Sequence, residues 1–180
     1  LSVVPASSTS IYDGADNAAS TTQSGNTASL TEKVVPTISS VSLNAANSEL
    51  TVTFDESVYN TTGGAGDLEV GDFALSILGG VATVTPTPSS ITRTSQATWV
   101  LGLTISGTAN GSETLSVVPA SSTSIYDGAD NAASTTQSNN TVTLVDSAAP
   151  TITGTTVASD NSTIVVTFSD AVYNATGGSG

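Results

Sequence analysis

The chain has 180 residues, and its formal net charge at pH 7 is −13 because 15 acidic residues face only Lys33 and Arg93. It contains no Cys, Met or His, whereas Ser and Thr together make up one third of the residues. The missing residue types exclude disulfides, thiolate nucleophiles, zinc sites built from Cys and His, and the Ser-His-Asp triad. The negative charge argues against nucleic acids and anionic membranes as partners, because both attract clustered cations.

Hydrophobic residues make up 37% and charged residues only 9% of the chain, unlike a charge-rich disordered polymer. No run approaches the roughly 18 to 20 apolar residues that span a bilayer, so we expect no membrane insertion in this segment. The sequence opens at Leu1 with neither Met nor a basic leader. We therefore expect a soluble excerpt of a longer chain.

The N-terminal segment returns later in the chain, since residues 1–24 recur letter for letter as residues 115–138. The same offset of 114 residues continues without a gap, so that residues 1–66 align with 115–180 and 42 of these 66 pairs are identical. A period of this length is too long for a solenoid repeat and typical of an independently folding domain. The sequence therefore predicts a tandem array of domains.

Two linkers are expected between the repeats, at residues 31–36 and 145–150. Each carries one acidic residue, Glu32 or Asp146, and ends in Pro, which cannot donate to a strand ladder. This phasing divides the chain into the C-terminal part of one repeat (1–30), a complete repeat (31–144) and the N-terminal part of the next (145–180).

Period-two alternation of apolar residues is the main secondary-structure signal, and no stretch shows a convincing helical period. Three alternating runs each place their apolar side chains on one face: Leu50, Val52 and Phe54; then Phe73, Leu75 and Ile77; then Trp99, Leu101, Leu103 and Ile105. Further strands are expected at about residues 37–43, 81–84, 114–118 and 140–145. A repeat would then hold seven or eight short strands.

Two residue pairs stand between alternating runs, Gly79-Gly80 and Asn110-Gly111. Both contain residues that tolerate a positive φ angle, so we expect hairpin turns at both places. Pro86 and Pro88 interrupt the strand that ends at Val84.

Short antiparallel strands, with one face apolar and the other rich in Thr and Ser, indicate an all-β fold, an immunoglobulin-like antiparallel β-sandwich repeated in tandem. A barrel is the weaker alternative. A parallel β-helix would show an inner period of roughly 18 to 25 residues, and none is visible. Trp99, the single Trp, lies in mid-strand among apolar neighbours, which favours a core position over a ligand-stacking role.

Three stretches carry a family resemblance: SELTVTFDESVYN (48–60), SIYDGADNAAS (124–134) and VDSAAPTI (145–152). They are similar to bacterial Ig-like and cadherin-like tandem repeats of giant cell-surface proteins, among them adhesins, S-layer-associated proteins and SwmB-like filament or motility proteins. The resemblance covers the whole chain and implies an extracellular, cell-surface location. Where such repeats end in an Asp-x-x-Gly-Asn turn, Asp130 replaces the Gly, which either strains the turn or adds a ligand.

Oxygen-bearing side chains gather in one short loop and at one strand end. Calcium prefers oxygen ligands, and the cadherin-like resemblance implies such ions at the junctions between repeats. The candidate calcium ligands are Asp127, Asp130, Asn131, Asp55, Glu56 and Asp146, with Asp13 and Asp16 as equivalents in the first partial repeat. We expect the loop to approach Asp55 and Glu56 or the linker residue Asp146. In the alternative, Asp127 and Asn131 accept backbone N–H bonds in Asx-type turns.

Residues 63–68 come close to the calcium-binding nonapeptide G-G-x-G-x-D, but Asp67 arrives one place early and no second nonapeptide follows. We interpret residues 59–68 as a loop or hairpin, with Asp67 or Asp72 as a lesser candidate for an ion ligand.

Catalysis would need a carboxylate pair in which one pKa is raised, as in glycoside hydrolysis. The pair Asp55-Glu56 becomes Ser169-Asp170 in the next copy, and Lys33 becomes Ser147, which also undercuts an isopeptide bond. We expect no enzyme and no cofactor besides calcium.

The expected function is structural: an extracellular tandem-repeat segment of a giant bacterial surface adhesin or filament, acting as a spacer or assembly unit. Its partners would be neighbouring repeats, and identical chains that pair through open strand edges in a filament or layer. The alternative is a carbohydrate- or surface-binding β-sandwich module. That alternative predicts exposed aromatic residues near the loops, where only Tyr59 and Tyr126 are available per repeat.

Overall fold

The computed structural model describes residues 1–178, and Ser179 and Gly180, which close the repeat alignment, lie outside the described residues. The strands are β1 (Ile38–Leu43), β2 (Glu49–Phe54), β3 (Phe73–Leu78), β4 (Thr83–Val84), β5 (Ser90–Ser95), β6 (Thr98–Gly102), β7 (Ile105–Ser106), β8 (Thr114–Pro119), β9 (Thr141–Thr143), β10 (Ile152–Val157) and β11 (Ile164–Phe168), with one short 3-10 helix, η1 (Val70–Asp72). Every pairing of these strands is antiparallel. The predicted all-β class is confirmed.

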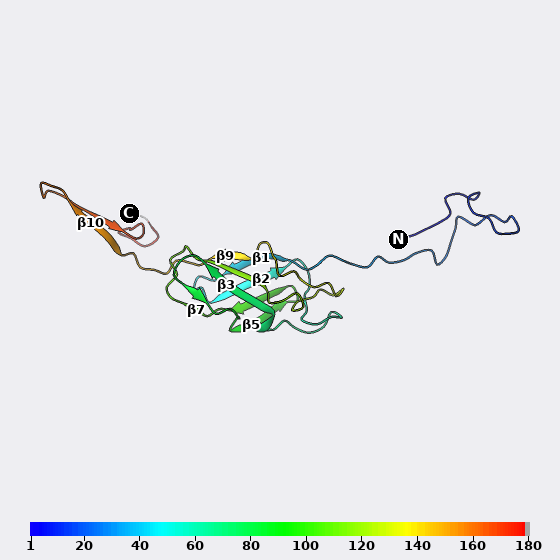
Figure 1. Ribbon diagram of the computed structural model, residues 1–180, viewed down its shortest axis with the longest axis horizontal. Coiled ribbons are helices and arrows are strands. Elements are labelled where there is room, and N and C mark those ends of the chain that lie inside the picture. The colour runs from blue at the N-terminus through cyan, green and yellow to red at the C-terminus, as the bar shows by residue number, and fades with distance from the viewer. Residues whose placement is uncertain (179–180) are drawn as a thin grey trace.

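Two sheets face each other in the middle of the chain and form the central sandwich, residues 38–144 (Figure 1). One sheet has the strand order β1-β2-β6-β5, the other has the order β3-β8-β9, and β4 and β7 form a separate short pair. Phe54 of the first sheet meets Phe73 of the second, with ring centroids 6.4 Å apart. The core lies between the two sheets.

The alternation read from the sequence sets the inner face of each sheet. Along β2 and β8 every second residue is buried, as expected for antiparallel strands with one face on a core. Trp99 of β6 is 1% exposed, and its Nε1 donates to the Gln96 carbonyl oxygen at 3.3 Å. The predicted core position of Trp99 is confirmed.

The third alternating run does not form one strand. Residues 98–102 belong to β6, which pairs with β2 and β5, whereas β7 pairs with β4. Between them Leu103 donates to the Ser48 carbonyl and Thr104 accepts from Thr85. The apolar alternation continues across the break because both parts of the run face the same core.

Strand β5 was not predicted, since its sequence SITRTS shows no apolar alternation and only Ile91 is even half-buried against the core. It is an edge strand, and edge strands need only one row of partners and little burial. β4 and β9 are shorter than the predicted segments 81–84 and 140–145.

The two predicted hairpin turns join strands of different sheets. Gly79-Gly80 connects β3 to β4 and Asn110-Gly111 connects β7 to β8, but β3 pairs with β8 and β4 with β7. The hairpin prediction was therefore wrong. The positive φ angles are present, at 82° for Gly79, 58° for Gly80 and 78° for Gly111.

The flanking segments leave the central sandwich from opposite ends (Figure 1). In the C-terminal hairpin, β10 and β11 repeat the register of β1 and β2, including the irregularity after the first pair. In the N-terminal segment, residues 1–30, Val3 bonds to Asn26 as Val117 bonds to Asn140. The copies therefore share local backbone structure with the equivalent parts of the sandwich.

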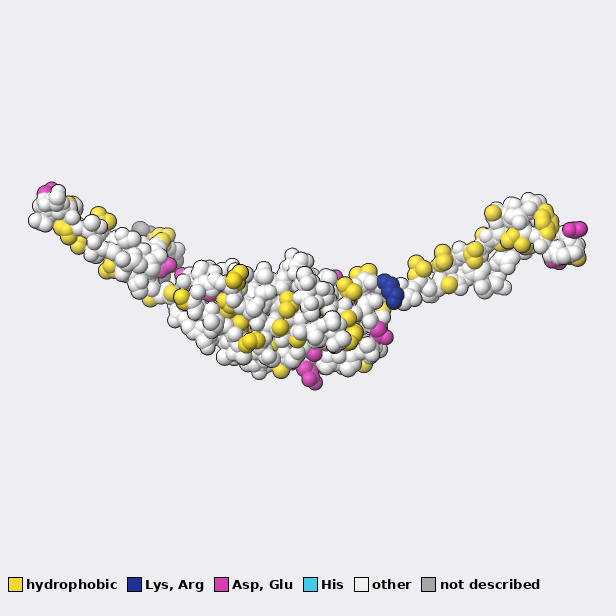
Figure 2. All heavy atoms as spheres, in the orientation of Figure 1, with side chains coloured by type: hydrophobic (Ala, Val, Ile, Leu, Met, Phe, Trp, Pro, Cys, Tyr) yellow, Lys and Arg dark blue, Asp and Glu magenta, His cyan; other side chains and the backbone are white. Residues whose placement is uncertain are grey.

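Burial separates these copies from the sandwich. Ile152 is 60% exposed where its equivalent Ile38 is 1% exposed, and Leu1 is 79% exposed where Leu115 is fully buried. Figure 2 shows apolar side chains along both flanking segments. The flanking copies lack the facing sheet that covers these residues in the centre.

The pair Leu115 and Leu1 tests this difference within identical sequence. Leu115→Ala removes a core side chain and should lower the free energy of unfolding by about 2–5 kcal/mol. Leu1→Ala should change it by less than about 0.5 kcal/mol, as surface substitutions do. Urea denaturation followed by Trp99 fluorescence measures both, and equal effects would contradict the burial difference.

Candidate functional site

Asp127 organises the acidic loop of the central sandwich. Its side chain is fully buried. Oδ1 accepts the backbone N–H groups of Ala129 and Asn131, both at 2.8 Å, and Oδ2 accepts the Asn131 side-chain amide at 2.8 Å. Burial alone would raise the pKa of Asp127, but these hydrogen bonds outweigh it and hold the pKa below its usual value. The Asx-turn alternative is confirmed for Asp127, whereas Asn131 uses its side chain as a donor.

The same loop contacts two other segments. Asn131 Nδ2 donates to Glu32 Oε2 at 2.6 Å, and the Gly63 N–H donates to Asp130. Asp130 has a φ angle of 68°, in the left-handed region that normally favours Gly and that Asp tolerates better than most residues. The loop thus joins the N-terminal linker to the turn at residues 61–65.

The corner at the end of β2 lies near this loop. Asp55 accepts the Thr37 backbone N–H at 2.8 Å and the Thr37 hydroxyl at 2.7 Å. Burial, and then the charges of Asp127, Asp55 and Glu32, raise the pKa of Glu56. The backbones of Tyr59 and Tyr126 pair with each other, so the loop approaches the segment that follows this corner, as expected.

Asp146 lies elsewhere. Its Oδ1 accepts the Ala148 N–H at 2.8 Å, and its Cβ would be 3.3 Å from a Cβ built at Gly111. The expectation that the loop approaches Asp146 was wrong, because the two linkers leave the sandwich at opposite ends (Figure 1). The linker acid that the loop meets is Glu32, which was not among the candidate ligands.

Asp13 and Asp16 build the same loop in the N-terminal segment. Asp13 accepts from the backbone of Ala15 and Asn17 at 2.8 and 2.9 Å and from the Asn17 side chain at 2.9 Å. Asn17 and then Ala15 lower the pKa of Asp13. Asp16 has a φ angle of 61°. This loop therefore forms locally, without a surrounding sandwich.

The arrangement of these residues does not fit a calcium ion. Within residues 1–178 no three or more acidic side chains gather closely enough to hold a metal. Both Asp127 oxygens already accept N–H groups, and the Asn131 amide presents its N–H donors toward Asp127 and Glu32. Calcium takes six to eight oxygen ligands, water and backbone carbonyls included, and the N–H donors around Asp127 occupy part of the capacity of its carboxylate. Calcium binding stays a prediction from the sequence.

The lesser candidates have other partners. Asp67 forms an ion pair with Arg93 on the surface. Asp72 accepts the Glu69 N–H at 2.7 Å at the start of η1, and burial raises its pKa. The predicted loop at residues 59–68 is confirmed, with a bridge between Thr61 and Ala65.

Glu113 is a buried carboxylate that no sequence pattern singles out. It is fully buried and accepts N–H groups from Val81 at 2.9 Å, Ala82 at 3.1 Å and Asn110 at 3.0 Å. A Cβ at Gly80 would lie 2.1 Å from Glu113 Oε1. Gly80 is therefore required because the carboxylate fills the space beside it. Glu113 also holds together the turns at residues 79–80 and 110–111.

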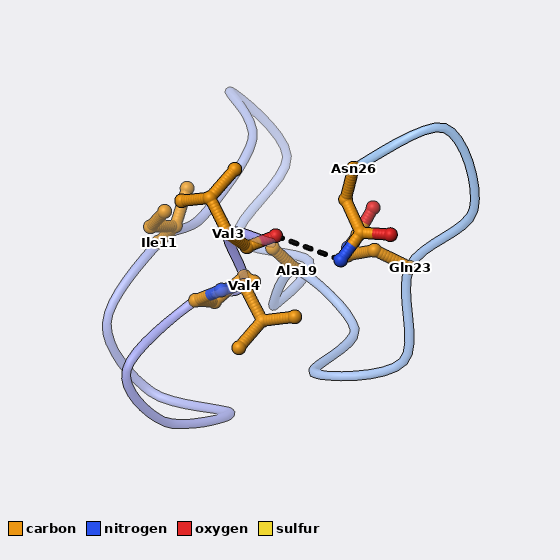
Figure 3. Close-up of a pocket in the computed structure, with 7 residues that line it drawn as sticks. Val3, Val4, Ile11, Ala19, Gln23 and Asn26 are labelled. Carbon is orange, nitrogen blue, oxygen red and sulfur yellow. Dashed lines mark hydrogen bonds between the residues drawn. The ribbon is translucent and has the colours of Figure 1, made fainter. Parts of the chain in front are cut away.

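An apolar hollow of about 360 Å³ lies in the N-terminal segment, between the side chains drawn in Figure 3. It is lined by Val3, Val4, Pro5, Ile11, Ala19, Gln23 and Asn26. The equivalents of three of these, Val117, Ile125 and Ala133, are buried in the core of the central sandwich. The hollow is therefore the uncovered core face of this segment, and no catalytic group lines it.

Comparison of the chain with protein-family models, curated proteins and solved structures found no match. The part of the chain that the structure describes contains no helix of the length and apolarity needed to cross a bilayer.

Glu113 predicts how stability depends on pH. Burial raises its pKa, but the N–H groups of Val81, Ala82 and Asn110 outweigh burial and lower the pKa from 4.5 to about 2. A carboxyl whose pKa is lower in the folded state stabilises fully above its unfolded value and loses this contribution as the pH falls toward the folded value. The free energy of unfolding should fall between about pH 4.5 and pH 2, and less steeply in Glu113→Gln.

Chemical denaturation at a series of pH values measures this slope. Glu49→Gln, at an exposed position on β2, is the matched control and should keep the slope of the parent chain. Equal slopes in the parent chain and Glu113→Gln would contradict the assignment.

Calcium titration tests the metal hypothesis directly. Because the oxygens of Asp127 are already bonded to N–H groups, we expect no rise in Tm when calcium is added in millimolar excess over chelator. A concentration-dependent rise would show binding to the folded state through linkage. Loss of such a rise in Asp127→Asn, but not in Asp13→Asn, would place the ion in the loop of the sandwich.

Proposed function

We propose that residues 31–144 form one immunoglobulin-like unit of a tandem array, and that the array is a structural extracellular segment of a giant bacterial surface adhesin or filament. The observation that carries this proposal is the agreement between sequence repeat and local structure. Residues 115–138 and their identical copy form the same Asx loop, around Asp127 and Asp13. The hairpin β1-β2 and its equivalent one period later, β10-β11, pair their strands in the same register.

The strand order supports the immunoglobulin-like part of the proposal. With β1, β2, β3, β5, β6, β8 and β9 taken as A, B, C, D, E, F and G, the two sheets have the orders A-B-E-D and C-F-G. This is the arrangement of constant-type immunoglobulin domains. The short β4-β7 pair is an addition to it.

The exposed apolar residues of the flanks also support a tandem array. Val166 and Phe168 of β11 are 40% and 37% exposed, whereas their equivalents Val52 and Phe54 are buried under the second sheet. In an array, each flanking copy belongs to a unit whose facing sheet covers these positions. Neighbouring repeats are then the first partners of the central unit, and open edges such as β5 offer pairing to identical chains.

A mechanical role follows from this architecture. The chain enters and leaves the sandwich at opposite ends (Figure 1), so a pull along the array loads the unit between its ends. Interstrand hydrogen bonds and the core then resist extension. We propose no enzymatic activity for the chain. The extracellular location is inferred from the family resemblance.

The alternative role as a carbohydrate- or surface-binding module depends on aromatic residues near the loops. Tyr59 and Tyr126 are half-buried and bond to each other through their backbones, with both N–H to carbonyl distances at 2.8 Å. Their partial burial leaves less of each ring open for stacking on a ligand than full exposure would. Spacer function is therefore the better supported of the two.

Stretching the whole chain between its termini tests the spacer function. Force spectroscopy should show one unfolding event with a contour length of roughly 350–385 Å, because residues 38–144 unfold as one body at about 3.3–3.6 Å per residue. The exposed flanks should extend without a force peak. Smooth extension without any peak would contradict a mechanical unit, and reproducible saturable binding of the chain on a glycan array would favour the binding module.

A further inference from the structure

Asn47 fastens the chain where it leaves the central sandwich. It lies in the turn between β1 and β2 with a φ angle of 55° and is only 8% exposed. Its Nδ2 donates to the Val145 carbonyl oxygen at 2.7 Å, and the Val145 N–H donates to its Oδ1 at 2.8 Å. Both polar atoms of the Asn47 side chain are thus bonded to the backbone of Val145, the first residue of the linker. The side chain pairs with this backbone as the backbone of a neighbouring strand would.

The next linker residues are also held by the sandwich they leave. The Ser147 N–H donates to the Ala109 carbonyl at 2.9 Å, and Asp146 lies against Gly111. Only Ala149 and Pro150 then separate Ala148 from Thr151. Because Pro150 has a fixed φ angle, the backbone between Ala148 and Thr151 has little conformational freedom.

The chain is fastened again as soon as the following strands begin. The Thr151 N–H donates to Ser169 Oγ at 2.9 Å, and the Ser169 N–H donates to the Thr151 carbonyl at 2.8 Å. A groove of about 390 Å³ runs between the two parts. Its lining combines the end of the sandwich at Val81 and Asn110, the linker at Ala148 and Ala149, and the start of the hairpin at Thr151 and Ser169.

The first linker shows the contacts that a complete following unit makes. Glu32, the equivalent of Asp146, accepts from Asn131 of the sandwich it precedes, and Ile38 donates to Gln137 Oε1 at 2.8 Å. A linker acid therefore binds the acidic loop of the unit that the chain enters. The same position, Asp146, touches the unit that the chain leaves.

We propose that successive units are held in a fixed relative orientation because each linker is hydrogen-bonded to both units it joins, with Asn47 as the residue that fastens it to the unit it leaves. This inference rests on the tandem array proposed above. The partner of the exit face, around Asn47, Ala109 and Gly111, is the entrance corner of the next repeat. Direct hydrogen bonds make the junction.

The chain contains its own matched control. Asn161 occupies the equivalent turn between β10 and β11, with a φ angle of 58°, and it is exposed. Gly at either position keeps the left-handed backbone and removes the side chain. A comparison of Asn47→Gly with Asn161→Gly therefore isolates the contact with the linker from any effect on the turn.

Amide hydrogen exchange in the full chain, resolved by NMR, tests the proposal. In the parent chain the Val145 and Ser147 amides should be protected, and so should the Leu144 amide, which bonds to the Glu113 carbonyl at 3.0 Å. Asn47→Gly should speed exchange at Val145 by about 10- to 100-fold, the effect of losing the hydrogen bonds of one side chain. Leu144 should stay protected, and Asn161→Gly should change neither site.

Relaxation of ¹⁵N in the hairpin gives a second readout. In the parent chain β10 and β11 should tumble with the central sandwich, and in Asn47→Gly they should gain independent motion. If Asn47→Gly fails to fold, Asn47→Asp replaces it. That variant keeps the acceptor for the Val145 N–H and loses the donor to the Val145 carbonyl, so it should keep Val145 protected and loosen the hairpin.

Unprotected Val145 and Ser147 amides in the parent chain, or equal effects of the two Gly variants, would overturn the inference. These outcomes are separable from failure of the proposed function. A chain with one normal unfolding peak and an unprotected linker is a spacer with flexible joints, whereas a chain with a protected linker and no peak has a stiff junction and no mechanical unit.

Discussion

The fold depends on the burial of one apolar face of each sheet against the other. Phe54 and Phe73 meet across this interface, and Trp99 fills it from the centre of the first sheet. The flanking copies show what the same residues do without a facing sheet: Leu1 and Ile152 keep their local backbone but remain exposed to solvent. Burial of apolar area is the main favourable term in folding. The central sandwich is therefore stabilised by the pairing of its two sheets and not by any single segment.

Buried polar groups complete the fold in a way that suits a chain with few cations. The one ion pair within residues 1–178 joins Arg93 to Asp67 on the surface. The buried carboxylates of Glu113 and Asp127 are instead satisfied by backbone N–H groups and an amide side chain. A carboxylate with two or three such donors can stay ionised in the interior. Although the composition is acidic, every buried side-chain N or O atom in the described residues has a hydrogen-bond partner.

These polar groups also connect the sandwich to the chain on either side. Asn131 bonds the incoming linker through Glu32, and Asn47 bonds the outgoing linker through Val145. Both residues lie in turns, where the backbone is free to place a side chain toward a passing segment. In the proposed spacer, these contacts at the linkers help to fix the relative orientation of successive units. The proposed fixed orientation depends on direct hydrogen bonding of short linkers, whereas the proposed mechanical role depends on the interstrand hydrogen bonds and the core of the sandwich.

Only the part of the candidate site that depends on residues close together in sequence could be predicted. The Asx turn at Asp127 follows from residues 127–131 alone, and it forms equally at Asp13, outside any sandwich. The partner of that loop did not follow, because Glu32 is 99 residues away from Asn131 in sequence and nothing in the composition relates the two. The role of Glu113 could not be predicted for the same reason. Its carboxylate accepts N–H groups from two turns that only the packing of the sheets brings together.

The sequence by itself determined the period of 114 residues, the all-β class and the inward faces of β2, β3 and β6, because repeats and period-two alternation are properties of the residue order. Tertiary structure alone decided that the run from Trp99 to Ile105 divides between two sheet pairings, that β5 is a strand, and that the two Gly-containing turns cross between sheets. Alternation records only whether a side chain is buried. Which strand lies beside which is decided by hydrogen bonds between segments far apart in sequence.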